Sequence, residues 1–409
     1  MSAAKFPPVE EQLAYLRKGS AETIPEAELK AKLENSLKTG VPLRVYLGVD
    51  PTAPDIHLGH TVVLRKLKQF QDMGHTAIFM IGDFSALIGD PTGVSETRPP
   101  LNREQVDANA KTYLEQVFKI LDKDKTEVRY NNEWLGKLTS QEVVQLCAKY
   151  RLARMLERED FRSRLESNTP ISVHELLYPL LTAYDAVALK SDVELGATEQ
   201  KFNLLVHREI QREFGLVPQV IMTMPILVGL DGERKMSKSL GNYVAITEAP
   251  SQMFGKIMSI SDTTMWPYYE LLTDFGPPVI TRLRDEVSKG LLHPMEAKMQ
   301  LAHTIVAGFH GEAAAKSATE EFQTVFRERK APTEMPELKL PAGARALNAL
   351  VAEAGLAPSR SEADRLIKQA AVEVNGEIEK DVKRQVTLGA GETVTLRVGK
   401  KRFLKVKGA

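Results

Sequence analysis

Between residues 43 and 245 the chain alternates short, continuously apolar stretches with longer stretches in which apolar residues recur at helical spacing. The apolar stretches that read as strands are residues 43–49, 76–81 and 219–224. The stretches with helical spacing are residues 109–121, 140–156 and 199–214. Strands that are apolar throughout are typical of a parallel sheet covered on both faces. The alternation therefore predicts a doubly wound, Rossmann-like α/β domain with ligands beyond the carboxyl ends of its strands.

The pattern changes twice after this region. Residues 251–330 have helical spacing throughout, and the proline-rich residues 331–343 read as a stiff linker. Residues 344–409 mix one helical stretch with alternating apolar and polar positions around turns, which is typical of a small α+β domain. We therefore predict a catalytic domain in residues 1–250, a helical domain in 251–330, a linker and a final domain. The 409 residues are enough for several domains.

Composition narrows the class of protein further. The chain contains 54 Lys and Arg and 54 Asp and Glu, so its net charge does not indicate a nucleic-acid or membrane partner. Cys147 is the only cysteine, which excludes an intramolecular disulfide and a cysteine-based metal site, and we expect it in the core. No apolar run approaches the ~20 residues of a membrane span, and the N-terminus lacks signal-peptide features. These observations predict a cytoplasmic protein that holds no metal of its own.

The final segment departs from this neutral balance. Residues 344–409 contain 13 Lys and Arg against 8 Asp and Glu, a net charge of +5. A solvated charged tail would explain the excess, but the basic residues are interleaved with a patterned core, which favours an RNA-binding module. A helix is expected to begin there, with Ser361 or Ser359 as its N-cap. The candidate RNA-binding residues are Arg360, Arg365, Lys368, Lys400, Lys401 and Arg402.

Two short motifs carry the chemistry. Residues 57–60 read His-Leu-Gly-His directly after the first strand, and residues 235–239 read Lys-Met-Ser-Lys-Ser in a loop flanked by glycines. Either motif alone could be an ordinary surface turn. Together and in this order they resemble the two signature sequences of the class I aminoacyl-tRNA synthetases. The pairing turns two weak signals into a strong one.

The chemistry of ATP activation suits these residues. A carboxylate that attacks the α-phosphate of ATP is already an anion, so catalysis reduces to positioning and to positive charge near the phosphates. His57 to His60 would open a helix whose free backbone N–H groups can meet phosphate, and Gly59 would let a flat base approach the backbone. Lys235 and Lys238 would then close over the phosphates from a distant loop.

A closer resemblance covers nearly the whole chain. Five segments look like the bacterial tyrosyl-tRNA synthetases, and most of residues 344–409 resembles the small RNA-binding domain named after the ribosomal protein S-four. Tryptophanyl enzymes share the catalytic fold but, as a family, lack that terminal domain. The five segments are residues 46–55, 88–93, 131–134, 178–185 and 224–232. The resemblance implies a tyrosine–tRNA ligase that uses tyrosine, ATP with Mg²⁺, and tRNA(Tyr), and that forms a homodimer through helices between residues 131 and 184.

The family pattern assigns the amino-acid pocket. Tyr46 and Asp185 would hold the phenol hydroxyl of the substrate, Asp90 and Tyr178 its ammonium group, and Asp50 would lie close by. Phenylalanine would leave the buried polar pair unpaired, a relation for which tyrosine-specific synthetases are the standard illustration. Without the resemblance, Tyr178 could be ordinary packing and Asp90 a turn residue. Asp185, between apolar positions, needs a partner in any case.

The same pattern assigns the ATP site. Thr52, His57 and His60 would contact the phosphates, with His60 acting mainly in the transition state. Lys235 and Lys238 would hold the departing pyrophosphate. The other candidates for ATP are Gly59 for the base, Arg98 for the triphosphate, and Glu199 and Gln200 for the ribose.

Three positions depart from what most relatives carry. Thr182 stands in place of Gln, which we expect to weaken the hold on the substrate amino group. Glu199 replaces Asp, and Val94 occupies the place of a basic residue, which leaves Arg98 alone beside the triphosphate. Two other hypotheses stay open, and these departures favour only the second of them. One is a sister enzyme for tryptophan or an unusual aromatic amino acid, and the other is an RNA-binding protein on a synthetase scaffold that no longer catalyses.

Overall fold

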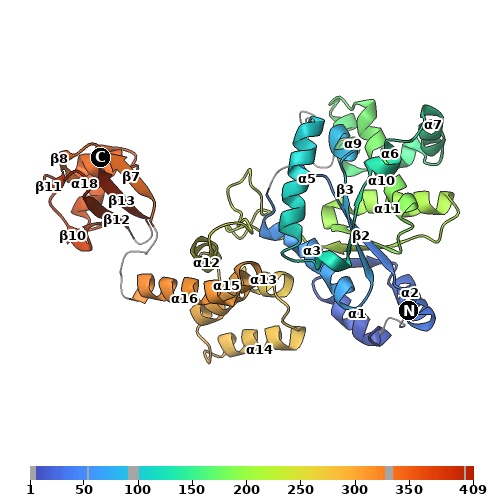
Figure 1. Ribbon diagram of the computed structural model, residues 1–409, viewed down its shortest axis with the longest axis horizontal. Helices are drawn as coiled ribbons and strands as arrows, with labels where there is room; N and C mark the ends of the chain where they lie inside the picture. Colours follow the sequence, from blue (N-terminus) through green and yellow to red (C-terminus); the bar gives the residue numbers. More distant parts are fainter. Residues whose placement is uncertain (1–5, 53–54, 91–100, 328–334, 400–401) are drawn as a thin grey trace. The chain divides into compact units, whose positions relative to one another are not determined.

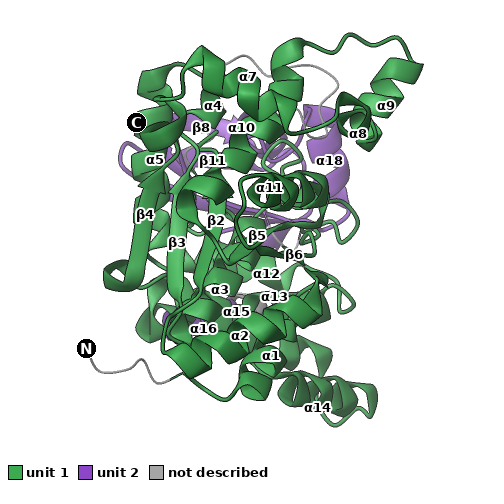
Figure 2. Cartoon of the chain, turned by 90° about the vertical axis from the view of Figure 1, so that its right-hand side faces the viewer, with its two compact units in different colours: residues 1–315 green, residues 316–409 purple. Residues whose placement is uncertain are grey.

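The computed structural model describes residues 6–52, 55–90, 101–327, 335–399 and 402–409 (Figure 1). The chain divides into two compact units, residues 1–315 and residues 316–409 (Figure 2). Four residues named above, Val94, Arg98, Lys400 and Lys401, lie outside the described residues.

A mixed sheet forms the centre of the first unit. Among the described residues of this unit, six strands are ordered β1-β6-β5-β2-β3-β4. All neighbours from β6 to β4 run parallel, and β1 pairs antiparallel with β6 at the edge. The strands are β1 (Glu22–Ile24), β2 (Arg44–Val49), β3 (Thr76–Ile81), β4 (Thr126–Tyr130), β5 (Val193–Ala197) and β6 (Val220–Met224). The predicted parallel sheet is confirmed, and the short edge strand β1 is an addition.

Helices cover both faces of this sheet (Figure 1), as the continuously apolar strands require. The strand order reverses between β2 and β5, because β3 and β4 extend from one side of β2 while β5 and β6 extend from the other. Ligands of doubly wound sheets bind beyond the carboxyl ends of the strands at such a point. The fold therefore places the site after β2 and β5.

The helices around the sheet differ in part from the expected ones. They are α1 (Val9–Arg17), α2 (Glu26–Thr39), α3 (Leu58–Asp72), α4 (Ser85–Ile88), α5 (Arg103–Val117), α6 (Asn132–Leu135), α7 (Ser140–Ala148), α8 (Leu152–Met155), α9 (Glu159–Glu166), α10 (Val173–Leu189) and α11 (Lys201–Glu213), with 3₁₀ turns η1 (Lys123–Lys125) and η2 (Thr198–Gln200). The single helix predicted for residues 140–156 was wrong. It breaks because Arg151 adopts extended backbone angles, and apolar spacing continues across the break. α5 begins earlier than expected, because Asn102 and Gln105 form a capping box.

Two neighbouring helices, α10 and α11, form one wall above the sheet. Ala186 and Leu189 of α10 pack against Tyr46 of β2 and Ile78 of β3. The pattern of apolar residues did not predict α10 as a helix, because Pro179 lies inside it. This wall carries several of the predicted amino-acid-binding residues.

The helical region after residue 250 is confirmed as far as Arg327. Its helices are α12 (Pro250–Met258), α13 (Met265–Leu272), α14 (Pro277–Ser288), α15 (Pro294–His310) and α16 (Glu312–Arg327). The Tyr269 hydroxyl donates to the backbone oxygen of Ala297 at 2.6 Å, which ties α13 to α15. No helix within the described residues combines the length and apolar character that a membrane crossing requires.

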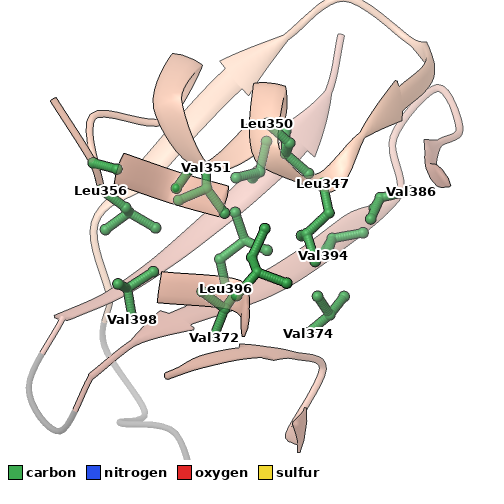
Figure 3. Packing of buried hydrophobic residues seen from close by; sticks show 14 of the residues in the cluster. Leu347, Leu350, Val351, Leu356, Val372, Val374, Val386, Val394, Leu396 and Val398 are labelled. Carbon is green, nitrogen blue, oxygen red and sulfur yellow. The ribbon is translucent and has the colours of Figure 1, made fainter. Parts of the chain in front are cut away.

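The second unit begins within α16, and the rest of it is a small α+β fold. The elements after α16 are β7 (Glu337–Leu340), β8 (Gly343–Ala346), α17 (Leu347–Glu353), α18 (Arg360–Lys368), β9 (Val372–Val374), β10 (Glu377–Glu379), β11 (Gln385–Leu388), β12 (Thr393–Val398) and β13 (Arg402–Gly408). In the part of this unit that the structure describes, five strands are ordered β10-β9-β12-β13-β7, and β11 pairs with β8. Figure 3 shows the core between α17 and the strands, where Leu350, Val372 and Leu396 meet.

Two details of this unit differ from the expectation. Ser359, the second of the two candidates, is the N-cap of α18, and its hydroxyl accepts a hydrogen bond from the backbone of Glu362. Residues 337–340 fall within the expected linker but form β7, which pairs in parallel with β13. This strand was not predicted from the sequence, because Pro336 and Pro341 flank it and its partner β13 lies at the far end of the chain.

Candidate active site

A cavity of about 500 Å³ opens where the strand order reverses, beyond the carboxyl ends of β2 and β5. The start of α3, one face of α10 and the start of α11 complete its walls. Most predicted site residues line it: Tyr46, Asp50, Thr52, His57, Gly59, His60, Asp90, Tyr178, Thr182, Asp185, Glu199, Gln200 and Lys235. Lys238 is not in this lining and instead lies 3.7 Å from Asp55. The structure thus gathers residues that are far apart in sequence.

The two histidines form the N-terminal cap of α3. The Nδ1 atom of His57 accepts a hydrogen bond from the backbone N–H of Gly59 at 3.2 Å. The Nδ1 atom of His60 accepts one from the backbone N–H of His57, also at 3.2 Å. Burial lowers the pKa of His57 to about 3, and the charges of His60 and Lys238 act in the same direction. Burial also lowers the pKa of His60, although its side chain opens to the cavity.

These caps fix the tautomer of both rings. A neutral imidazole carries one hydrogen, and an accepting Nδ1 leaves that hydrogen on Nε2. His57 and His60 can therefore each donate one hydrogen bond from Nε2 without carrying a charge. The free N–H groups of the first turn of α3 add further donors. This corner of the cavity is built to receive phosphate oxygens.

The lysine loop reaches the same corner. The Nζ atom of Lys235 lies 3.2 Å from a carboxylate oxygen of Glu199, so the two predicted ATP residues contact each other. The loop is shaped by Asn242, whose side chain accepts from the Ser237 backbone and donates to the Lys235 backbone oxygen. Lys235 pairs with Glu199, and Lys238 pairs with Asp55. Both carboxylates are exposed, so phosphate groups can replace them as partners of the lysines.

A backbone link joins the two motifs. The N–H of Leu58 donates to the backbone oxygen of Val244 at 3.0 Å, just past the lysine motif. A Cβ atom added to Gly59 would lie 3.6 Å from the Cβ of Met236 and 3.0 Å from the ring of His57. Glycine at position 59 is thus favoured by the close approach of the His57 ring, whereas the contact with Met236 would be an ordinary one.

The inner end of the cavity contains a half-buried carboxylate, Asp50. It accepts hydrogen bonds from the hydroxyls of Tyr178 at 2.8 Å and Ser85 at 2.6 Å. Burial raises its pKa to about 7, and the charge of Asp90 acts in the same direction. A Cβ on Gly82 would lie 2.0 Å from the Asp50 carboxylate, so only glycine fits there. A half-buried acid of this kind is suited to a cationic ligand group.

A second acid, Asp185, is buried on α10. Its two oxygens accept hydrogen bonds from the Trp134 indole N–H at 2.7 Å and the Asn131 amide at 3.3 Å. Burial raises the pKa of Asp185 well above its ordinary value. Tyr46 is also buried, and within the described residues its hydroxyl has no hydrogen-bond partner. An unsatisfied hydroxyl beside a carboxyl group is the arrangement that a substrate hydroxyl would complete.

Several polar residues that line the cavity had no role predicted from the sequence, among them Ser85, Glu194 and His207. Ser85 binds Asp50, and Glu194 and His207 bind each other at 2.8 Å. Glu194 could have been noticed, because it is a charged residue in an otherwise apolar strand. Ser85 and His207 could not be predicted in this way, because neither is an unusual residue for its own helix and their partners are distant in sequence.

In the second unit, three of the four described basic candidates have local partners. Arg365 pairs with Glu362 at 2.5 Å, and Arg360 lies 3.9 Å from Glu353. Arg402 donates to the backbone oxygen of Leu356 at 2.6 Å. Arg360, Arg365 and Lys368 all lie on α18, which places them on one short helix.

Comparisons with known proteins agree with this architecture. A family model described as "tRNA synthetases class I (W and Y)" matches residues 38–327, and an S4 domain model matches residues 347–392. The tyrosine–tRNA ligase of Geobacter sulfurreducens is 55% identical over 400 residues, which cover 97% of this chain and 99% of that protein. The tyrosine–tRNA ligase of Moorella thermoacetica is 54% identical over 398 residues, covering 97% and 96%.

Solved structures share the fold of the first unit. The tyrosyl-tRNA synthetase from Archaeoglobus fulgidus, complexed with L-tyrosine, aligns with a TM-score of 0.61 at 22% identity over 76% of this chain and all of that one. The sheet, the capped histidines and the lysine loop together define a class I aminoacyl-tRNA synthetase. Within that class, the chain belongs to the family of bacterial tyrosine–tRNA ligases. The resemblance drawn from the motifs is thereby confirmed.

Proposed function

We propose that this chain activates tyrosine with ATP and transfers it to the 3′ end of tRNA(Tyr). The observation that carries the proposal is sequence identity above one half with tyrosine–tRNA ligases over nearly the full length of both chains. The cavity adds a physical argument, because Tyr46 and Asp185 offer a buried polar pair to a hydroxyl. An indole would present only a donor there.

In the first step, a carboxylate oxygen of tyrosine attacks the α-phosphorus of ATP. A new carboxyl–phosphate bond forms, the bond between the α-phosphorus and the bridging oxygen breaks, and pyrophosphate leaves with both electrons of that bond. His57 and His60 donate from Nε2 to the phosphate oxygens, and Thr52 contacts them from the loop after β2. Lys235 and Lys238 exchange Glu199 and Asp55 for the departing pyrophosphate. These groups supply charge and position, which is the catalysis that this step needs.

Tyrosine occupies the inner half of the cavity. Its ammonium group faces Asp50, Asp90 and Tyr178, and its phenol faces Tyr46 and Asp185. Thr182 donates its hydroxyl hydrogen to the backbone oxygen of Tyr178 at 2.9 Å. Threonine also lacks the amide oxygen with which Gln could accept a hydrogen bond from the ammonium group. This contact supports the expectation that the replacement of Gln by Thr weakens the hold on that group.

ATP occupies the outer half. Gly59 lies against the base, Glu199 and Gln200 bind the ribose, and Arg98, outside the described residues, is assigned to the triphosphate. Mg²⁺ is expected to arrive with ATP, where it would screen the phosphate charges, and no residue of this chain is assigned to it. In the second step, a terminal ribose hydroxyl of tRNA attacks the carbonyl carbon of tyrosyl-adenylate, and AMP leaves.

The remaining parts of the chain are assigned to tRNA. Residues 251–330 would contact the anticodon arm, and residues 344–409 would bind RNA through the basic positions of α18 and through Lys400, Lys401 and Arg402. The domain boundaries at residues 250, 330 and 343 remain part of this proposal.

A homodimer and a cytoplasmic location complete the proposal. Several large apolar side chains in the region between residues 131 and 184 are exposed, among them Val173 at 73%, Val144 at 68% and Leu152 at 60%. Exposed apolar residues gathered in one part of a chain are typical of a protein interface. A second copy of this chain would cover them.

The test is aminoacylation of a tRNA(Tyr) transcript with each labelled aromatic amino acid. The proposal predicts ATP-dependent charging with tyrosine and none with tryptophan or phenylalanine. Charging with tryptophan would contradict the pocket assignment, and binding of tRNA without any charging would favour the scaffold hypothesis. Sedimentation of the same sample tests the dimer, since a monomer at micromolar concentration would overturn it.

A further inference from the structure

Three polar residues without an assigned joint role line the amino-acid half of the cavity as one connected group. The Nδ1 atom of His207 lies 2.8 Å from a carboxylate oxygen of Glu194, and its Nε2 atom lies 3.1 Å from the hydroxyl of Thr182. All three side chains belong to buried residues and all three line the cavity. His207 thus links α11 to β5 and to α10 at once.

The position of this group relative to the substrate follows from the spacing on α10. Tyr178, Thr182 and Asp185 are at i, i+4 and i+7, which lie on one face of a helix. Tyr178 stands at the ammonium end and Asp185 at the phenol end of the proposed tyrosine site. Thr182, with His207 behind it, therefore lies between the two ends. Glu194 is the register partner of Tyr46 on the neighbouring strand, which places it at the phenol end.

The donors and acceptors around Glu194 are fixed by a second layer. Its other oxygen accepts from the side-chain amide of Gln219, whose own oxygen accepts from the Ser191 hydroxyl at 2.5 Å. Gln211 in turn donates to Ser191 and accepts from the backbone of Gln219. Because Glu194 is an acceptor on both oxygens, His207 must donate from Nδ1. That bond holds the carboxylate in place.

The Glu194 carboxylate lies close to the buried hydroxyl of Tyr46. The Tyr46 hydroxyl is fully buried, lines the cavity and has no hydrogen-bond partner within the described residues. The nearby charge of Glu194 also contributes, after burial, to the raised pKa of Tyr46. A carboxylate at this place therefore influences how Tyr46 meets a substrate hydroxyl, and its position depends on His207.

We propose that His207 is a positioning residue for amino-acid selection, which holds Glu194 beside the Tyr46 hydroxyl so that the phenol end of the pocket rejects a substrate without a hydroxyl. This inference rests on the proposed function, since it assumes that tyrosine occupies the cavity. It adds Glu194 and His207 to the determinants of tyrosine over phenylalanine. Thr182 supports the far side of the His207 ring.

The two ring nitrogens suggest a matched pair of variants. Asn at position 207 places an amide nitrogen near the site of Nδ1 and can keep the bond to Glu194. Gln reaches instead toward the site of Nε2 and can keep the contact with Thr182 alone. We expect kcat/KM for tyrosine relative to phenylalanine, measured by ATP–pyrophosphate exchange, to fall on the order of tenfold in His207→Gln and His207→Leu but to stay near the parent value in His207→Asn.

Two further variants make the test decisive. Glu194→Gln should lose discrimination to a similar extent, because it removes the charge and keeps the shape. Ile210→Val, on the same helix and outside the cavity lining, controls for loosened packing and should leave the ratio unchanged, as should KM for ATP in every variant. Equal ratios for the folded Asn, Gln and Leu variants would overturn the inference. Absence of tyrosine-driven exchange in the parent chain would instead overturn the proposed function.

Discussion

His57 and His60 stack with their ring centroids 3.8 Å apart, at an interplanar angle of 28°. Each ring uses Nδ1 to cap α3, so the stacked pair presents two Nε2–H donors at the N-terminus of one helix. Two imidazolium rings could not stack this closely without repulsion, which agrees with the lowered pKa of both side chains. The pair is thus a neutral donor site whose geometry the helix itself maintains.

Replacing His60 with Ala should remove one donor that acts mainly on the transition state. We expect kcat for pyrophosphate exchange to fall by about 10²–10³, with the dissociation constant for tyrosine unchanged. The exposed His293 lies outside the proposed dimer interface and provides a control, since His293→Ala should leave both quantities unaltered. Rapid-mixing measurements of adenylate formation would decide, and a parallel loss of tyrosine affinity would show that His60 acts in substrate binding instead.

Lys238 should act later than the histidines, as the pyrophosphate leaves. Lys238→Ala should slow adenylate formation at least tenfold and leave tyrosine binding nearly intact, because its contact with Asp55 is weak and exposed at 3.7 Å. Lys38→Ala removes an exposed lysine outside the cavity lining and outside the proposed dimer interface, and it serves as the control. The role would be refuted if Lys238→Ala raised the dissociation constant for tyrosine as much as it slowed the reaction.

The raised pKa of Asp50 predicts a dependence on pH with a definite sign. Burial moves this pKa from 3.8 to about 7 in the folded chain. Protonation removes the charge that faces the substrate ammonium, so KM for tyrosine should rise as pH falls below about 7. Asp50→Asn should flatten this dependence while keeping hydrogen-bonding capacity. Steady-state kinetics between pH 5.5 and pH 8.5, roughly a unit or more on either side of that pKa, would test it, and a parent profile that is flat would contradict the assignment.

The same shift affects stability in the opposite direction along the pH scale. The folded state holds the Asp50 proton more tightly than the unfolded state between pH 3.8 and about 7. This group therefore contributes most to the free energy of unfolding at low pH, and its contribution declines as pH rises through that window. Urea unfolding of the parent and Asp50→Asn chains should show a smaller decline for the variant. An identical pH slope in both chains would mean that Asp50 does not carry the shift.

The proposed RNA-binding role of α18 can be tested by charge reversal in the full chain. Reversing two charges on α18, with Arg360→Glu and Lys368→Glu together, should spare pyrophosphate exchange, weaken tRNA charging and reduce the dependence of tRNA affinity on salt. Lys380→Glu with Lys383→Glu changes the charge of the same unit equally, away from α18, and should have a smaller effect. Equal losses in both double variants would indicate a general charge effect rather than a binding helix.

Much of this fold was predictable from sequence where one signal dominated. β3 spans the residues expected, because a run of six residues from Thr76 to Ile81 is apolar enough to require burial on both sides. The histidine and lysine motifs were brought to one cavity as expected, because each carries a spacing that has a chemical reason. The break after Ala148 and the strand β7 were missed, because apolar spacing continues through the first and prolines flank the second.

The amino-acid pocket was predictable only in part. Asp185 could be singled out, because it is a carboxylate among apolar neighbours. Its partners Trp134 and Asn131 could not be predicted, because they are distant from it in sequence. His207 gave no signal at all, because a lone histidine on an amphipathic helix is ordinary until Glu194 and Thr182 are placed on either side of it. Tertiary neighbours of this kind leave no periodicity in the chain.

The most direct test of the central claim is ATP–pyrophosphate exchange without tRNA, with each standard amino acid supplied separately. We expect exchange with tyrosine alone, because Tyr46 and Asp185 suit its phenol and Asp50 suits its ammonium group. The departures at Thr182 and Glu199 replace neither a histidine nor a lysine of the two motifs. Exchange with a different amino acid would keep the class of enzyme and contradict the pocket. No exchange from folded protein that still binds tRNA would contradict the catalytic claim itself.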